Sequence, residues 1–216
     1  MIELLLPEPV ACAEAFADVA DEPCFPGEER LVDRAVPARR QEFVTARRCA
    51  REALARLGFP PAPILPGPRR EPRWPAGVAG SITHCRGYRA AAVARVAHAA
   101  GVGIDAEPHG PLPEGVAASI SAAGEPEMLR GLRRADASTH WDRLLFSAKE
   151  SIYKAWFPLT RRELEFEDAR LTIDPATRTF VGHVTADGGD PGLKTLHGRY
   201  LVTGGLVVTA VLVPGR

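Results

Sequence analysis

The sequence predicts an α+β fold built from two similar halves, because a helix followed by several strands occurs twice along its 216 residues. Proline and glycine break the chain at 108–113, between the two sets of elements. We therefore expect one half over 1–110 and the other over 111–216. Apolar residues make up 45% of the chain, enough to build a core without disulfides.

The first half is expected to hold one amphipathic helix and three strands. Apolar residues recur at spacings of three and four over 37–57, which predicts a helix that Gly58 and Pro60 end. A proline-rich loop covers 60–77, whereas scattered acids and prolines make 1–30 an irregular segment. Strand-like runs follow the loop at 78–84, 88–96 and 102–107.

A helix over 141–157 is the clearest element of the second half, and Pro158 is expected to end it. Its apolar stripe is made of Trp141, Leu145, Ala148, Ile152 and Trp156. The segment 116–134 is more weakly helical, because Gly124 and Pro126 interrupt it. Strands are expected to close the chain at 164–173, 178–185, 197–203 and 206–213.

Composition excludes several classes of protein. The formal net charge is zero, which argues against nucleic acid as the main partner. No run of about 18 apolar residues predicts a membrane span, and no basic residue precedes the short apolar run at the N-terminus, so a signal peptide is not expected. The four cysteines form no C-x-x-C pair. We expect a cytoplasmic protein.

Two carboxylates end the strand predicted at 102–107, in the sequence GIDAE. Asp105 and Glu107 are two residues apart, so their side chains share one face of the strand. Like charges this close repel each other unless a cation lies between them. A small number of carboxylate oxygens suits Mg²⁺, which also binds substrate phosphates. Two solvated carboxylates at the end of a strand are the simpler alternative.

The helix at 141–157 carries Lys149, Glu150 and Lys154, although the chain has only three lysines. On a helical wheel Glu150 lies opposite the apolar stripe, Lys154 lies one turn further on the same side, and Lys149 lies at the flank. An exposed Glu–Lys pair is the ordinary alternative. Ser151 and Lys154 also fit the S-x-x-K motif of penicillin-binding enzymes, but the partner motifs of those enzymes are absent.

Several residues of the first half could contact phosphate. Strand alternation places Thr83 on one face and His84 on the other, and a histidine at a strand end can donate to a phosphate. Arginine binds phosphate through its planar guanidinium. The arginines in question are Arg39, Arg40, Arg47, Arg69 and Arg70. A solvated helix face is the alternative, favoured by the pairing of Arg48 with Glu52.

Together these motifs resemble the Sfp-type 4′-phosphopantetheinyl transferases. The resemblance rests on GIDAE at 103–107, FSAKESIYK at 146–154, SITH at 81–84 and RRQEFVTARRCAREAL at 39–54. The likeness is closest to the actinobacterial subgroup. It implies two α+β halves related by a pseudo-twofold axis, with the active site in the cleft between them. It also implies that the chain moves the phosphopantetheine arm of coenzyme A to a carrier-protein serine.

The resemblance also implies residue roles. Asp105, Glu107 and Glu150 would hold Mg²⁺, with Glu150 as the base and Lys154 stabilising the departing 3′,5′-ADP. Residues expected at coenzyme A are Arg39, Arg40, Arg47, Arg69, Arg70, Thr83, His84, Lys149 and Lys154. Many relatives have Gln or Glu at the position of Ala106, so a side-chain metal ligand is expected to be missing here. Close relatives often have Lys at the position of Pro66, so Arg69 or Arg70 would take over that contact.

The expected partners are apo acyl or peptidyl carrier proteins, with no nucleic acid or membrane, and the chain is expected to act as a monomer. The sequence does not distinguish fatty-acid, polyketide and nonribosomal-peptide carriers. We expect the carrier to dock on 112–134, whose apolar residues could alternatively pack inward. A non-catalytic carrier- or nucleotide-binding module and a Mg²⁺-dependent phosphohydrolase remain alternatives.

Overall fold

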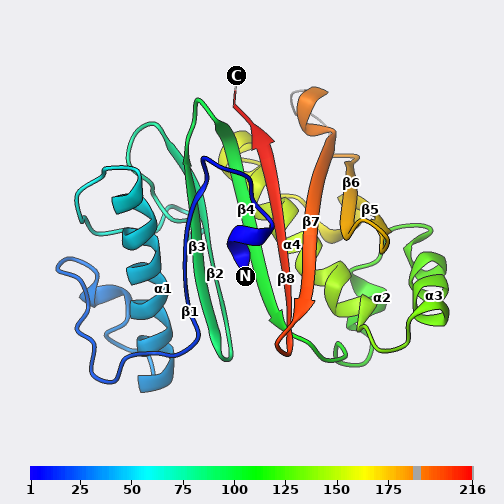
Figure 1. The fold of residues 1–216 in the computed structure, drawn as a ribbon, viewed down its shortest axis with the longest axis horizontal. Helices are drawn as coiled ribbons and strands as arrows, with labels where there is room; N and C mark the ends of the chain where they lie inside the picture. The colour runs from blue at the N-terminus through cyan, green and yellow to red at the C-terminus, as the bar shows by residue number, and fades with distance from the viewer. Residues whose placement is uncertain (187–190, 216) are drawn as a thin grey trace.

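In the computed structural model, which describes residues 1–186 and 191–215, the first half of the chain forms a three-stranded antiparallel sheet. The strand order is β1 (Ala11–Ala15), β3 (Tyr88–Arg95), β2 (Val78–Cys85). Helix α1 (Pro37–Arg56) covers one face of this sheet (Figure 1). The prediction of a helix followed by strands is confirmed here.

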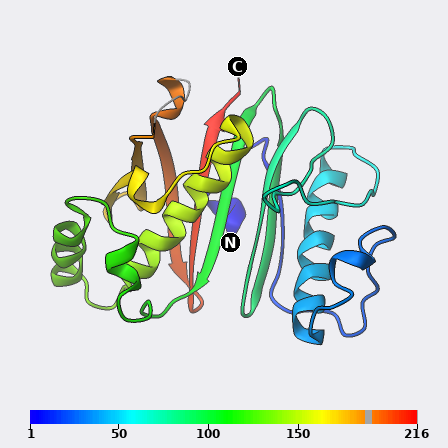
Figure 2. The same ribbon diagram turned by 180° about the vertical axis from the view of Figure 1, so that it is seen from behind.

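The second half is built around a five-stranded antiparallel sheet of order β4-β8-β7-β6-β5. Its strands are β4 (Ala99–Pro108), β5 (Ala169–Asp174), β6 (Thr179–Val184), β7 (Thr195–Thr203) and β8 (Leu206–Pro214). Helix α4 (Trp141–Thr160) lies along β4 and β8, and the short helices α2 (Val116–Ser119) and α3 (Glu125–Ala135) lie beyond it (Figure 2). The predicted α+β class, with a helix on a sheet in each half, is confirmed.

Strands β2 and β4 lie side by side where the two sheets meet. Side chains join them in place of a main-chain ladder. Ile104 donates its N–H to Ser81 Oγ at 3.1 Å, and Ala106 donates its N–H to Thr83 Oγ1 at 3.0 Å. In the main-chain ladder β4 pairs with β8, so it belongs to the five-stranded sheet although it precedes the predicted boundary at residue 110.

The N-terminal segment is more ordered than its composition predicts. Ala11–Ala15 forms an edge strand that pairs with the alanine-rich strand β3. Ile2 is fully buried. Glu14 anchors this segment, because its carboxylate accepts hydrogen bonds from Ile2 N at 3.1 Å and from the Tyr88 hydroxyl at 2.5 Å. Alanine has a low strand propensity, which explains why the sequence did not indicate this strand.

Helix α4 continues past Pro158 and ends at Thr160, so the expectation that Pro158 ends it is wrong. Proline removes only one donor near the end of the helix, and Arg161 closes the last turn by donating its N–H to Phe157 O at 2.8 Å. Strand β5 starts later than expected, since Phe166–Asp168 forms a 3₁₀ turn held by a capping box.

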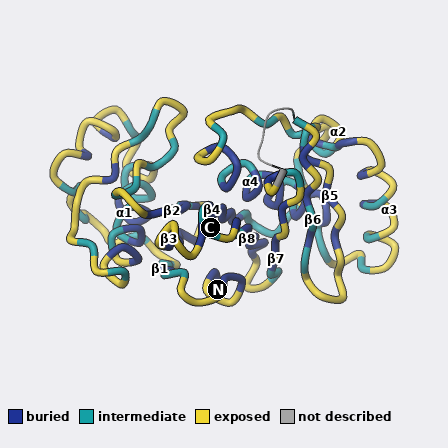
Figure 3. The backbone as a smooth tube through the Cα atoms, turned by 90° about the horizontal axis from the view of Figure 1, so that it is seen from above, coloured by how far each residue is buried: buried dark blue, intermediate teal, exposed yellow. Residues whose placement is uncertain are grey.

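Three apolar clusters hold the molecule together. One lies between α4 and the five-stranded sheet and contains the whole predicted stripe of α4. A second lies between α1 and the three-stranded sheet. The third covers the back of β3, β4 and β8, where Ile2, Leu5 and Leu6 pack on it. Buried residues accordingly follow both sheets and the inner faces of the long helices (Figure 3). No helix among the described residues is both long and apolar enough to span a bilayer.

Candidate functional site

Two glycines on β4 let helix α4 lie directly against the strand. A Cβ atom added to Gly103 would be 1.9 Å from Ser151 O, and one added to Gly101 would be 3.0 Å from Ala155 O. Asp105 is next on the same face, because side chains of a strand alternate. The G-x-G pattern thus serves helix packing and brings Asp105 under the middle of α4.

Each carboxylate of β4 is paired with a cation from α4. Lys154 Nζ lies 2.7 Å from Asp105 Oδ1 and also donates to Ile104 O at 3.2 Å. Arg143 Nη1 lies 2.9 Å from Glu107 Oε2. Thr83 donates its hydroxyl to Asp105 Oδ1 at 3.3 Å. The face of α4 that carries Lys154 therefore neutralises both acids.

Glu150 is half-buried on the same face of α4. Burial raises its pKa, the charges of Asp105 and Glu107 raise it further, and Lys154 opposes them. The pKa of Glu107 is raised in the same way, first by burial and then by Asp105, against the effect of Arg143. The charges of the three acids therefore influence one another.

The donor set suits a divalent cation that also binds the substrate. Asp105 Oδ2 is buried and makes no hydrogen bond, which leaves one oxygen of the carboxylate for a cation. No three His, Cys, Asp or Glu side chains in the described part of the chain are grouped tightly enough to hold a metal on their own. Mg²⁺ usually binds through one or two carboxylates, waters and substrate phosphates. The residues therefore fit Mg²⁺ held jointly with a phosphate.

A cavity of about 550 Å³ lies between α1, β2 and the loop that joins them. Its cationic side chains are Arg30, Arg39, Arg47 and Arg70. Arg47 donates from Nε to Ile64 O at 3.0 Å, and its guanidinium lies 4.2 Å from the centre of the Phe43 ring. Burial lowers the pKa of Arg47 and the charge of Glu28 opposes this shift. The contacts with Ile64 O and Phe43 fix the orientation of the Arg47 guanidinium in the cavity wall.

His84 and Arg39 stand together at the β2 side of this cavity. Arg39 Nη1 lies 2.9 Å from His84 Nε2 and also donates to Glu42 at 3.0 Å. Burial, followed by the charge of Arg39, lowers the pKa of His84 to about 4. His84 is therefore neutral near pH 7 and can offer a neutral N–H to a ligand.

Two smaller cavities flank Glu150. One, of about 210 Å³, is lined by Glu150 and Lys154 and shares Arg70, Pro72 and Ile82 with the 550 Å³ cavity. The other, also about 210 Å³, lies on the opposite side of Glu150, with Tyr153, Leu164 and Phe166 in its wall. Glu150 and Tyr153 therefore belong to the walls of both cavities.

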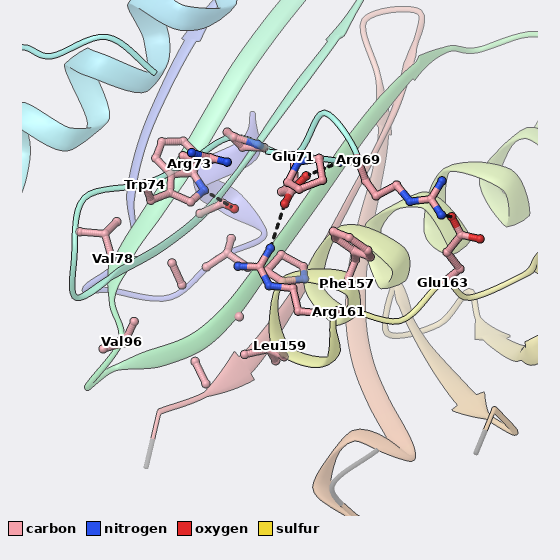
Figure 4. Close-up of a pocket in the computed structure, with 18 residues that line it drawn as sticks. Arg69, Glu71, Arg73, Trp74, Val78, Val96, Phe157, Leu159, Arg161 and Glu163 are labelled. Carbon is pink, nitrogen blue, oxygen red and sulfur yellow. Dashed lines mark hydrogen bonds and ion pairs between the residues drawn. The ribbon is translucent and has the colours of Figure 1, made fainter. Parts of the chain in front are cut away.

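Another cavity, of about 870 Å³, is not lined by the three acids. It lies between the proline-rich loop and the end of α4, with Trp74, Val78 and Leu159 in its wall (Figure 4). It shares Glu71 and Phe157 with the cavity at Lys154. Arg69 also lines it, with its guanidinium 2.7 Å from Glu163.

The structure does not place Lys149 in the phosphate path. Lys149 Nζ lies 2.8 Å from Glu125 and donates to Ile120 O at 2.8 Å and to Phe166 O at 2.7 Å. Both side chains of the pair are almost completely buried. This corrects the predicted phosphate contact, because all three ammonium protons are used within the protein. The helical wheel placed Lys149 at the flank, and the acid that covers this flank comes from α3.

Three further expectations differ from the structure. Thr83 is buried, and its hydroxyl holds β4 and Asp105 in place, so Thr83 is a supporting residue of the site. Ala106 faces the core behind β4, so a longer side chain there would point away from Asp105. Arg40 is half-buried on α1 but does not line the 550 Å³ cavity.

Sequence reasoning missed Arg143 and Tyr153. Arg143 holds Glu107 and also donates to Gly110 O at 3.2 Å and Pro111 O at 2.9 Å, which fixes the chain that leaves β4. Its spacing of seven from Glu150 places both on one face of the helix, so periodicity could have indicated it. Tyr153 lines both small cavities.

Comparison with known proteins identifies the family of the chain. Residues 27–94 match the family model of the 4′-phosphopantetheinyl transferase N-terminal domain. Residues 101–208 match that of the 4′-phosphopantetheinyl transferase superfamily. Among curated relatives, transferase Svp of Streptomyces mobaraensis is 53% identical, over 99% of this chain and 89% of its own length. Transferase PptT of Mycobacterium tuberculosis is 49% identical, over 95% and 92%.

Transferase Npt of Nocardia iowensis is 47% identical, over 98% of this chain and 99% of its own length. The resemblance that the motifs indicate, including its actinobacterial character, is thereby confirmed. The chain belongs to the 4′-phosphopantetheinyl transferase superfamily.

Proposed function

We propose that this chain transfers the 4′-phosphopantetheine arm of coenzyme A to a serine of an apo carrier protein and releases 3′,5′-ADP. One observation carries the proposal. Asp105, Glu107, Glu150 and Lys154 gather beside a cavity that shares Arg70 with the arginine-lined cavity over α1. A site of this kind suits a substrate with a nucleotide at one end and a phosphate to be transferred at the other.

Coenzyme A would bind with its nucleotide in the 550 Å³ cavity. Arg47 and Arg39 are the side chains best placed for the 3′-phosphate, because both are oriented by neighbours and face the cavity. Charge-assisted hydrogen bonds from guanidinium groups are strong and specific for phosphate. The pyrophosphate would follow Arg70 toward Lys154, and the pantetheine arm would pass Glu150 into the cavity at Phe166.

Asp105, Glu107 and Glu150 are the residues that would hold Mg²⁺. When bound, the cation would neutralise charge on the pyrophosphate as the P–O bond breaks. The buried, unpaired Oδ2 of Asp105 supports this assignment. Lys154 pairs with the other oxygen of Asp105, so it already stands next to the place where phosphate would bind.

The reaction needs a base for the serine. The serine oxygen forms a bond to the phosphorus that carries the pantetheine arm, and the bond from this phosphorus to the bridging oxygen breaks. The serine proton goes to Glu150, whose pKa is raised by burial, a shift in the direction that favours a general base. Lys154 stabilises the negative charge that develops on 3′,5′-ADP as it leaves.

The carrier would approach from the side of α2 and α3, which adjoin the pantetheine end of the site. Part of the expected apolar surface is not available, because Ile120 and Leu129 are buried in the core. Arg133 and Arg134 remain exposed on α3. Carrier proteins of this class are acidic around the serine, so these charges would steer the encounter.

Intact-mass measurement of an apo carrier after incubation with coenzyme A and Mg²⁺ tests the proposal. The expected result is a gain of one phosphopantetheine, together with release of 3′,5′-ADP that depends on the carrier. Release without carrier would indicate the Mg²⁺-dependent phosphohydrolase instead. Binding with no release in either case would indicate a non-catalytic module.

A further inference from the structure

The tripeptide Arg-Arg-Glu occurs twice, at 69–71 in the proline-rich loop and at 161–163 after helix α4. The two copies pair with each other reciprocally. Arg161 Nη1 lies 2.8 Å from Glu71 Oε1, and Arg69 Nη2 lies 2.7 Å from Glu163 Oε1. The first arginine of each copy thus meets the glutamate of the other, across the gap between the two halves (Figure 4). We call Arg69, Glu71, Arg161 and Glu163 the clasp.

The loop side of the clasp is a closed hairpin. Pro66 and Pro72 form a β-bridge, and Arg73 donates its N–H to Leu65 O at 2.8 Å. Glu71 is folded over the tip, where a Cβ atom on Gly67 would be only 2.1 Å from its carboxylate oxygen. The loop therefore holds the carboxylate of Glu71 at a defined place.

Glu71 also binds within its own loop. Its Oε2 accepts the N–H of Arg69 at 2.9 Å, while Oε1 accepts from Arg161. Its side chain is only 13% exposed, whereas that of Arg161 is 66% exposed. A carboxylate shielded to this extent, and oriented by a backbone donor, interacts more strongly than a freely rotating surface acid.

The helix side is equally well defined. Arg161 is the C-cap of α4 and adopts a left-handed backbone conformation with φ of 56°. Its guanidinium lies 6.0 Å from the centre of the Phe157 ring. The clasp therefore joins the loop to the end of the same helix that carries Glu150 and Lys154.

Arg70, the middle residue of the loop copy, stands between the two cavities that coenzyme A would occupy. It lines both the 550 Å³ cavity and the cavity at Lys154. Its side chain is exposed, and its backbone has a φ of 67°, a conformation that the hairpin imposes. Arg70 forms no ion pair with any described residue, although its neighbours Arg69 and Glu71 each form one.

We propose that the clasp is a positioning device that holds Arg70 over the phosphates of coenzyme A by fixing the hairpin to the catalytic helix. This inference rests on the proposed function, because coenzyme A is the ligand. The clasp residues act through Arg70 and touch no reacting atom. Salt screens exposed ion pairs, so the effect of the clasp on coenzyme A binding is expected at low ionic strength.

The test compares two single charge reversals, Glu71→Arg and Arg161→Glu, with the double exchange that restores opposite charges. Each single change should weaken coenzyme A binding about three- to tenfold at low salt, and the double variant should recover most of the lost affinity. Arg178→Glu, an exposed charge reversal on the far β5–β6 turn, is the matched control. Calorimetry without carrier measures the affinity.

Hydrogen exchange of the ligand-free variants gives a readout that does not depend on the function. The amides of Gly67 and Arg73, which close the hairpin, should exchange hydrogen faster in both single variants. Their exchange rates should return to the original values in the double variant. Unchanged exchange would overturn the clasp. Faster exchange with unchanged coenzyme A affinity would overturn its positioning role. Failure of the unaltered protein to bind coenzyme A would contradict the proposed function. The hydrogen-exchange measurement would still decide whether the clasp exists.

Discussion

Lys154 Nζ and Asp105 Oδ1 form a 2.7 Å ion pair at the place where helix α4 crosses strand β4. The side chain of Asp105 is 6% exposed, and its second oxygen has no partner. One carboxylate thus holds a lysine on one side and leaves an unsatisfied acceptor on the other. Such an arrangement is poor for stability and well suited to receiving a cation.

Asp105→Asn should remove nearly all transferase activity and leave the fold intact. Asparagine keeps an oxygen for Lys154 and Thr83, but it removes the charge that would bind Mg²⁺. Tm should fall modestly, because Lys154 loses its charged partner and the new side-chain NH2 replaces the buried Oδ2 without an acceptor. Steady-state rates and a thermal melt check both parts. Normal turnover at equal Mg²⁺ would refute the metal assignment.

Stabilisation by Mg²⁺ and coenzyme A should be greater at pH 8 than at pH 5. The folded-state pKa values of Glu107 and Glu150 are raised, so ionising them costs stability as the pH rises through the raised values. Because these pKa values are raised, a larger fraction of both acids is protonated at pH 5 than at pH 8, and a protonated acid does not bind a cation. Thermal shifts with and without Mg²⁺ at both pH values give the comparison, with Asp105→Asn as the control. Equal shifts at both pH values would contradict the prediction.

Arg47→Ala should weaken the binding of coenzyme A roughly tenfold or more, since a charge-assisted hydrogen bond contributes about 1.5–3 kcal/mol. The loss should be smaller for 3′-dephospho-coenzyme A, which lacks the group that Arg47 is expected to bind. Calorimetry with both ligands measures the difference. A similar loss for the two ligands would place Arg47 elsewhere on the nucleotide.

Lys149→Met should destabilise the protein without a matching loss of coenzyme A affinity. The substitution removes the cation beside the buried Glu125, which keeps only the N–H groups of Ala122 and Leu171, each at 2.6 Å. The loss costs up to about 3–5 kcal/mol and should lower Tm by up to roughly 10 °C. Adding Glu125→Gln should recover little of it, because each carboxylate oxygen accepts a backbone N–H and glutamine keeps only one acceptor. Denaturant unfolding and calorimetry separate the two effects. Unchanged stability with weakened coenzyme A binding would restore the phosphate role first expected for Lys149.

Reversing the charges of Arg133 and Arg134 should slow association with an acidic carrier at low salt. Both arginines are exposed at the end of α3, so they act at long range and salt screens them. Stopped-flow measurements at two ionic strengths check this, with Arg178→Glu as a control. Normal association at low salt would move the docking surface elsewhere, with Arg161 and Arg162 as the next positions to examine.

Local patterns predicted the long elements and the face of α4 that carries Glu150 and Lys154. The periodicity over 141–157 gave the buried stripe and, opposite to it, Glu150 and Lys154. Strand alternation likewise placed Asp105 and Glu107 on one face. These residues follow from the chain itself, because helix and strand geometry fix which side chains lie together.

Long-range partners could not be predicted in this way. Glu125 and Lys149 are 24 residues apart, yet their pairing decides whether the lysine faces ligand or core. Strand β1 was missed because it is held by contacts with distant parts of the chain, its pairing with β3 and its packing on α1. The clasp depends on how two loops from different halves meet, which no local pattern contains.

The joint between β2 and β4 has a mechanical consequence. Main-chain ladders would lock the two strands along their whole length, but here the hydroxyls of Ser81 and Thr83 hold them at two points. These hydroxyls accept hydrogen bonds from the amides of Ile104 and Ala106, which lie directly on either side of Asp105. The position of Asp105 relative to the three-stranded sheet is therefore set by two side-chain hydrogen bonds, one on each side of it.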